Sequence, residues 1–428
     1  MIQAYLYARY GCKTPGEAAK AKAERCSEGS GGSGRPPVFR SGLSTIHAVQ
    51  EVVTAAKMME RGNHRTRSLC LLATLDVRNA FNSVRWDLAR EALERNFGVP
   101  KYPLRIIDDY LNERCLVYNT SDGPRSLEST SGAAHGSILV PDICNIFYDG
   151  IFRMAVPEGT FLVGYADDIA IVITARDTEG AQLLLKQVMR RVPSWMEDHG
   201  LFLAAQKTER VLITWTRINT LRSFIVGNAA VQTNSAVKYF GVMLNNKLNY
   251  GEHINRAADK AAKVVASLGM LMANVNGPRP CMRRLLMRAA EVVMLYGAEV
   301  WAETLRKQKY RKRIAAVQRR GDHQIACSYR KVSEPAVLVV AGVIPIDLLA
   351  QERKFVYQQR CILGKERASR LARSIIIKAC QSRWEQERRG RWTARFISQL
   401  DTWINREAGV VDFYLTEFLT WPVPILPG

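Results

Sequence analysis

Amphipathic stretches and apolar runs alternate through the first 250 residues of the chain. The spacing of apolar positions predicts a helix from Thr45 to about Arg61, with Ser44 as its cap. The apolar face of this helix comprises Ile46, Val49, Val53 and Ala56. The run from Leu69 to Val77 is almost wholly apolar, which is typical of a strand buried on both faces. A second amphipathic helix is predicted from about Asp87 to Phe97.

Two further β-rich runs lie close together in the sequence, at 160–165 and 169–174. They flank Ala166-Asp167-Asp168, which is typical of the tip of a β-hairpin. The later elements are predicted as a helix at about 179–199 and strands at 211–215 and 237–244. This part of the chain therefore mixes helices and strands within one domain.

Beyond residue 250 helical periodicity dominates and the strand signals fade. Residues 27–37 are rich in Gly, Ser and Pro, which predicts a flexible linker. We therefore divide the chain into a flexible leader at 1–37, a mixed domain at 38–250 and a helical basic region at 251–428. No run of 18 apolar residues occurs, so a membrane span is not expected.

The charge balance points to a polyanionic partner. The 428 residues carry a formal net charge of +21. Residues 251–428 hold 31 Lys and Arg against 16 Asp and Glu, a net of +15, and residues 1–250 hold the remaining +6. Such a field attracts nucleic acid first, although simple surface basicity is the structural alternative.

Three carboxylates stand out by position. Asp76 ends the apolar strand, and Asp167 and Asp168 lie at the predicted hairpin tip. Acidic groups brought together at strand ends repel one another, and divalent cations remove that conflict. Mg²⁺ prefers oxygen ligands, and two ions about 3.5–4 Å apart can stabilise both oxygens of a phosphoryl transfer. The structural alternative is a strand-end cap at Asp76 and a turn that merely favours Asp at 167–168.

Several ordered segments carry a resemblance to a known family. LDVRNAFNSVRW (75–86), HGSILVPDICNIFYDG (135–150) and YADD (165–168) resemble the successive palm motifs of reverse transcriptases from non-LTR (LINE-like) retrotransposons. GLFLAAQKTE (200–209) and VKYFGVML (237–244) resemble later segments of the same enzymes, the second being their primer-grip hairpin. Further similar segments are FRSGLSTIHA (39–48), LYGAEVWA (295–302) and GRWTARFISQLDTW (390–403), so the resemblance covers about residues 38–420.

The resemblance implies a fold and an activity. The fold would be α+β: a right-hand polymerase palm, made of an antiparallel sheet with helices, with partial fingers and a mainly α-helical thumb and C-terminal region. The activity would be RNA-directed DNA synthesis from dNTPs on an RNA template and a DNA primer, with two Mg²⁺ ions or with Mn²⁺. No membrane partner is implied, the oligomeric state is left open, and the expected location is intracellular, in the nucleus or the cytoplasm.

The resemblance also assigns roles to residues of this chain. Asp76, Asp167 and Asp168 would form the acidic metal centre, with help from the carbonyl of Val77. Lys207 would lie near the leaving pyrophosphate, although a solvated surface lysine is the alternative. The remaining expected contacts are Phe81 as a gate against ribose, His135 and Gly136 at the template–nucleotide pair, Tyr239, Phe240 and Gly241 at the primer end, and Arg311, Lys312 and Arg313 on phosphates.

Two departures from the family pattern support a second reading. His135 stands where the family usually has Gln, and most of the upstream fingers region is replaced by the short leader. The chain therefore resembles an N-terminally truncated member. The alternative function is a catalytically inactive nucleic-acid-binding remnant of such an enzyme.

Overall fold

A computed structural model describes residues 44–61, 68–132, 137, 139–165, 168–204, 208–216, 218–226, 229–273, 275, 277–406 and 411–420. The described residues fall into two compact units, divided between Leu248 and Asn249. We call them the mixed unit (44–248) and the helical unit (249–420). The boundary predicted from the sequence lies at Tyr250, two residues further along the chain.

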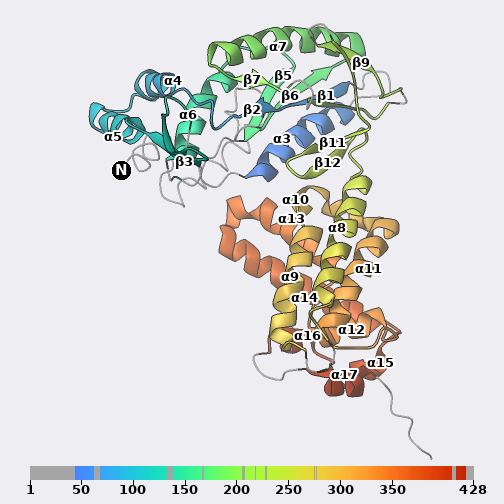
Figure 1. The fold of residues 1–428 in the computed structure, drawn as a ribbon. Helices are drawn as coiled ribbons and strands as arrows, with labels where there is room; N and C mark the ends of the chain where they lie inside the picture. The colour runs from blue at the N-terminus through green and yellow to red at the C-terminus, as the bar shows by residue number, and fades with distance from the viewer. Residues whose placement is uncertain are drawn as a thin grey trace, which may run out of the picture. The chain divides into compact units, whose positions relative to one another are not determined.

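The mixed unit contains helices and strands in alternation (Figure 1). Its helices are α3 (Thr45–Met58), α4 (Trp86–Glu91), α5 (Lys101–Leu111), α6 (Val140–Phe152) and α7 (Thr178–Asp198), with a 3₁₀ turn at Met59–Arg61 and a π-helical turn at Ala92–Asn96. Its strands are β1 (Leu69–Leu75), β2 (Val77–Arg78), β3 (Cys115–Thr120), β4 (Gly123–Glu128), β5 (Thr160–Tyr165), β6 (Asp168–Ala175), β7 (Phe202–Leu203), β8 (Glu209–Ile213), β9 (Ser223–Val226), β10 (Ala229–Gln232), β11 (Ala236–Tyr239) and β12 (Val242–Asn245).

A four-stranded antiparallel sheet in the order β5-β6-β1-β8 forms the centre of the mixed unit. Figure 1 shows helix α7 on one face of this sheet and helix α3 on the other. The odd-numbered residues of β1, such as Leu71 and Ala73, join the apolar cluster that includes α6 and α7. Because both faces are covered, β1 and β6 are buried along almost their whole lengths, as the uninterrupted apolar runs predicted.

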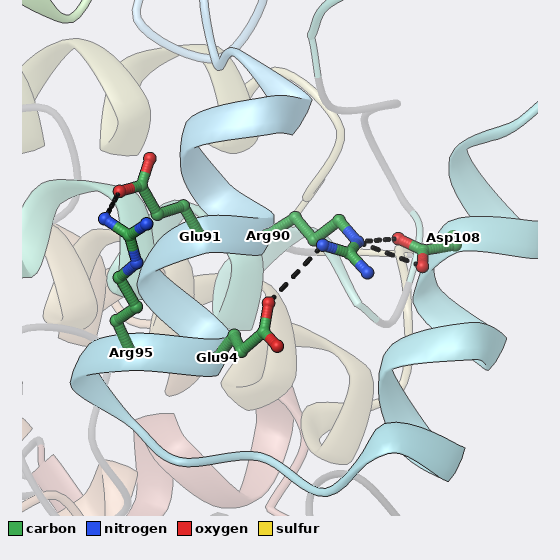
Figure 2. A network of polar contacts seen from close by, with 5 residues as sticks. All are labelled: Arg90, Glu91, Glu94, Arg95 and Asp108. Atoms are coloured by element: carbon green, nitrogen blue, oxygen red, sulfur yellow. Dashed lines mark hydrogen bonds and ion pairs between the residues drawn. The ribbon is translucent and has the colours of Figure 1, made fainter.

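The helices beside the sheet are linked by exposed ion pairs (Figure 2). The guanidinium of Arg90 donates from Nε to both carboxylate oxygens of Asp108, at 2.9 and 3.1 Å, and lies 3.5 Å from Glu94. Arg95 pairs with Glu91 one turn earlier. Exposed pairs of this kind contribute about 0–1 kcal/mol each, so they orient α4 and α5 and add little stability.

The helical unit has no strand among its described residues. Its helices are α8 (Gly251–Gly269), α9 (Pro280–Met294), α10 (Ala298–Trp301), α11 (Gln308–Ile325), α12 (Glu334–Ala341), α13 (Ile346–Leu363), α14 (Lys365–Gln386), α15 (Arg391–Phe396), α16 (Leu400–Ile404) and α17 (Phe413–Thr420), with a 3₁₀ turn at Ala302–Arg306. No single helix among the described residues meets the length and hydropathy expected of a membrane span, whereas α12 and α13, bent by 56°, meet them only as a pair.

The α+β class predicted from the sequence is confirmed, and some element predictions are corrected. The run 237–244 is the β11–β12 hairpin, as the resemblance implied, and not the single strand that its apolar pattern predicted, because Phe240 and Gly241 turn the chain in its middle. The run 69–77 is divided at Asp76 into β1 and β2. The helix predicted from about Asp87 begins at Trp86 and changes to π-helical geometry at Ala92.

Candidate active site

The strand register brings two of the predicted acidic positions to the same edge of the sheet. Strand β1 pairs with β6 up to Leu75 opposite Ile169. The next position along this antiparallel register places Asp76 beside Asp168. Asp168 is exposed and Asp76 is partly buried. The register therefore brings two carboxylates that are 92 positions apart in the chain to the same edge of the apolar core.

The backbone around Asp76 is held by a short ladder. The Ala204 amide donates to the Asp76 carbonyl oxygen at 2.8 Å, and Val77 pairs with Leu203 of β7. Val77 is buried and fixes β2 against this ladder. Strand β6 begins at Asp168, directly across a two-residue connection from Tyr165. Both acidic positions are thus set by backbone pairing.

Four predicted site residues lie outside the described residues: Asp167, Lys207, His135 and Gly136. The described residues contain no group of three or more His, Cys, Asp or Glu side chains arranged to hold a metal ion. The described part of the acidic centre therefore consists of Asp76 and Asp168.

Phe81 lies five residues after Asp76 and is partly buried against the apolar cluster of the mixed unit. The chain turns just before it, since Asn79 has a left-handed φ of 49° and the Asn82 and Ser83 amides both donate to the Asn79 carbonyl oxygen. This turn fixes the backbone from which Phe81 projects. Its position agrees with either a core residue or a gate beside the nucleotide.

The β11–β12 hairpin has a tight two-residue turn. Tyr239 pairs with Val242, and the intervening Phe240 and Gly241 both have positive φ, at 45° and 78°. Two positive φ values at the central positions define a type I′ turn, which matches the right-handed twist of the flanking strands. The Phe240 ring lies 5.9 Å from that of Tyr165, at 82° between the ring planes. The turn therefore lies beside the β5–β6 hairpin.

Tyr239 joins this turn to the acidic edge of the sheet. Its side chain is 2% exposed, and its hydroxyl makes no hydrogen bond with the described residues. Burial raises the pKa of the Tyr239 hydroxyl well above its usual value, and the carboxylates of Glu51 and Asp168 raise it further. The Tyr239 phenol is therefore neutral and lies near the carboxylates of Glu51 and Asp168.

Glu51 is a further acidic residue near Tyr239, and it was not predicted from the sequence. It lies on α3, and the surrounding protein atoms raise the pKa of its carboxyl to about 7. The residue nevertheless exposes a large part of its surface to water. The sequence carries no signal for Glu51, because an isolated Glu on the polar side of an amphipathic helix is ordinary.

The three basic residues predicted to contact phosphates lie on α11 of the helical unit. All three are exposed. Arg313 forms an ion pair with Asp259 of α8, whereas Arg311 and Lys312 make no hydrogen bond or ion pair with the described residues. Only the last two therefore present uncompensated charge.

Comparison with known proteins shows which proteins this chain resembles. Residues 34–244 match the family model described as "Reverse transcriptase (RNA-dependent DNA polymerase)". The Pol polyprotein of retrotransposable element R1 2 from Nasonia vitripennis is 25% identical over 291 residues, covering 63% of this chain and 71% of that protein. A putative 115 kDa protein of element R1DM from Drosophila melanogaster is 26% identical over 344 residues, covering 76% of this chain and 33% of that protein.

A further relative and one solved structure are also similar to this chain. A probable RNA-directed DNA polymerase from transposon BS of Drosophila melanogaster is 24% identical and covers 68% of this chain. The chain spans about a third of the length of that relative and of the R1DM protein (32% and 33%). Among solved structures, apo telomerase from Candida tropicalis has a TM-score of 0.42 at 11% identity, covering 92% of this chain and 61% of that chain.

Proposed function

We propose that this chain is an RNA-directed DNA polymerase, because residues 34–244 match the reverse-transcriptase family model and the chain is similar to proteins of R1-type retrotransposable elements. In this reaction a primer 3′-hydroxyl attacks the α-phosphate of a dNTP, and pyrophosphate leaves. The observation that carries the proposal is the register that sets Asp76 beside Asp168 at the edge of the central sheet.

The acidic edge suits a divalent metal. Carboxylate and carbonyl oxygens are the ligands that Mg²⁺ and Mn²⁺ prefer. In the proposal Asp76 and Asp167, with Asp168 and the Val77 carbonyl, hold two such ions. When bound, the ions would lower the pKa of the attacking hydroxyl and offset charge on the phosphates.

The other roles follow from the residues around the acidic edge. The type I′ turn at Phe240 and Gly241 would position the primer end, because it lies against the hairpin that carries Asp168. Phe81 would exclude a ribose 2′-hydroxyl. His135 and Gly136 would contact the template–nucleotide pair, and Lys207 would lie near the departing pyrophosphate.

Primer extension tests the proposal directly. The purified chain is incubated with a labelled DNA primer on an RNA template, the four dNTPs, and Mg²⁺ or Mn²⁺. We expect extension that EDTA abolishes, and a loss of at least about 100-fold in Asp76→Asn, Asp167→Asn and Asp168→Asn. Asp109→Asn is the matched control, since Asp109 is an exposed carboxylate on α5 of the same unit.

The outcomes separate the enzyme from an inactive remnant. If the unmutated chain binds the primed template but extends it with neither metal, the chain is a nucleic-acid-binding remnant and the proposal is wrong. If Asp109→Asn loses as much activity as Asp76→Asn, the acidic edge has no special role.

A further inference from the structure

A large basic groove runs through the helical unit. Its volume is about 2070 Å³, and its walls come from α8, α11, α12, α13, α14 and α16 and from the loops that follow α11, α12 and α14. Eight Lys and Arg residues line it against three Asp and Glu residues, a net of +5. This volume exceeds the roughly 300–1,000 Å³ of ordinary small-molecule pockets, so the groove suits a larger anion.

Most of the acidic charge in the groove is already neutralised. Asp347 accepts two hydrogen bonds from Arg383, at 3.0 and 2.9 Å. Glu387 accepts hydrogen bonds from the Nε and Nη2 atoms of Arg389, both at 3.3 Å. These four residues therefore cancel in pairs.

Five Lys and Arg side chains of the groove are available to bind an anion. Their side chains are exposed and make no hydrogen bond or ion pair with the described residues. They are Arg311, Lys312, Arg320, Arg330 and Lys331. Because this charge is uncompensated and accessible, it attracts an anion that carries several negative groups in a row.

The loop between α11 and α12 is built to display three of the groove residues. Tyr329, Arg330 and Lys331 are exposed, whereas the residues on either side, Ser328 and Val332, are buried. The Ser328 hydroxyl lies 2.7 Å from His323 Nδ1, and the Ser328 amide donates to the His323 carbonyl oxygen at 3.1 Å. The loop is thus fixed at both ends of the exposed run.

Arg319 completes the support of this loop. Its Nη2 atom donates to the carbonyl oxygens of Arg330 and Val332, at 3.3 and 3.0 Å. The Tyr329 ring packs edge-on against Phe413 at 5.6 Å and is still 51% exposed. An aromatic face and two cations are therefore held in place side by side, which lowers the entropy lost when a ligand binds.

The exposed Tyr329 ring favours one strand over two, because the unpaired bases of a single strand can stack on an aromatic ring. Along α11 the lining residues run from Gln308 to Gln324, about 24 Å at 1.5 Å per residue. The groove is therefore long enough to contact several successive phosphates of one strand.

We propose that this groove binds single-stranded nucleic acid, with Arg320, Arg330 and Lys331 on the phosphates and Tyr329 stacked on a base. Arginine binds phosphate through two parallel N–H donors, and aromatic rings stack on any base. The apolar walls, which include Ala315 and Leu338, accommodate the remaining base faces. This site would hold a template or product strand outside the polymerase centre, and it stands whether or not the chain polymerises.

Fluorescence anisotropy of the full chain tests the groove. The probes are labelled 20-nucleotide single-stranded RNA and DNA of the same sequence and the matching duplex, without divalent metal. The triple variant Arg320→Ala, Arg330→Ala and Lys331→Ala is compared with a control that removes the same charge from an exposed segment of α14. The control carries Lys365→Ala, Arg367→Ala and Arg370→Ala, none of which lines the groove.

We expect the groove variant to bind both single strands at least about tenfold more weakly, and the control to change little. The slope of log affinity against log salt should fall by about 2 in the groove variant, because each phosphate contact on a single strand contributes about 0.7. Ultraviolet crosslinking of the unmutated chain should attach the probe to the peptide that contains Tyr329. This mapping does not depend on any variant.

Three results would overturn the proposal. Equal losses in the two triple variants would mean that only the overall charge matters. Crosslinks absent from the Tyr329 peptide would place the strand elsewhere. Equal competition by poly-glutamate would assign the groove to an acidic polypeptide. None of these three measurements requires primer extension. The groove proposal and the polymerase proposal can therefore fail separately.

Discussion

The turn at the tip of the β11–β12 hairpin offers a sharp test of how backbone geometry supports the candidate active site. Gly241 has φ of 78°, in the region that glycine adopts without strain. In Gly241→Ala the new Cβ opposes that conformation. Phe240→Asn is the complementary change, because Asn-Gly is a favoured type I′ pair and only the ring is lost.

The magnitudes follow from the turn and from the ring contact. A left-handed conformation costs a non-glycine residue about 1–2 kcal/mol, and Phe240 already adopts one at φ of 45°. A further cost falls on a two-stranded hairpin, which has little stability of its own. We expect Gly241→Ala to lower kcat/KM for primer extension about 5- to 30-fold. Loss of the Phe240–Tyr165 ring contact should cost about two- to tenfold.

The assay is steady-state primer extension, combined with deuterium uptake of residues 236–245. The control is Gly123→Ala, in another hairpin with φ of 108° and no atom within 4 Å of an added Cβ. Gly241→Ala should raise deuterium uptake and lower extension, whereas Phe240→Asn should lower extension only. If Gly241→Ala opens the hairpin and extension is unchanged, the turn does not position the primer end.

Two further predictions concern the helical unit. Arg283 is buried and donates hydrogen bonds to the carbonyl oxygens of Pro278, Met272, Gln324 and Ala273. Because Arg283→Met leaves these carbonyl groups without their donor, it should lower the free energy of unfolding by about 3–5 kcal/mol in urea titrations. The exposed Arg288→Met should lower it by about 0.5 kcal/mol or less, and equal effects of the two variants would contradict this prediction. Burial, together with the charges of Arg319 and Arg330, lowers the pKa of His323 to about 4. Between pH 6.5 and 4 the unfolded chain binds a proton at this histidine that the folded chain does not bind, so the free energy of unfolding should fall by about 2–3 kcal/mol over that range. His323→Gln should remove this pH dependence from denaturation curves.

The central strands of the mixed unit could be predicted from the sequence, because they are buried on both faces. Uninterrupted apolar runs at 69–75 and 169–174, with polar residues at one end, identify such strands without any alternation. The β5–β6 hairpin follows directly, since only two residues separate its strands. The order of helices after residue 250 was likewise visible from periodicity.

Other elements escaped prediction for identifiable reasons. Strands β3 and β4 are exposed along nearly their whole lengths, so no buried face imposes a period of two on their sequence. Their one local signal was Asp122-Gly123 at the turn, a pair typical of hairpins. Helix α5, which follows directly after Pro100, was not predicted, although its buried Leu104, Ile107 and Leu111 have helical spacing.

Burial on both faces identifies β1 and β6 as strands, but it does not define the register in which they pair. In a strand with one polar face, a slip of one residue turns every side chain to the wrong side. Here both faces are apolar, so β1 could slide along β6 without exposing an apolar side chain. A slip of two residues would set Asp76 opposite Ala170, which is fully buried. Since burying an unpaired carboxylate is costly, the charge at position 76 itself favours the register that brings it to the exposed edge beside Asp168.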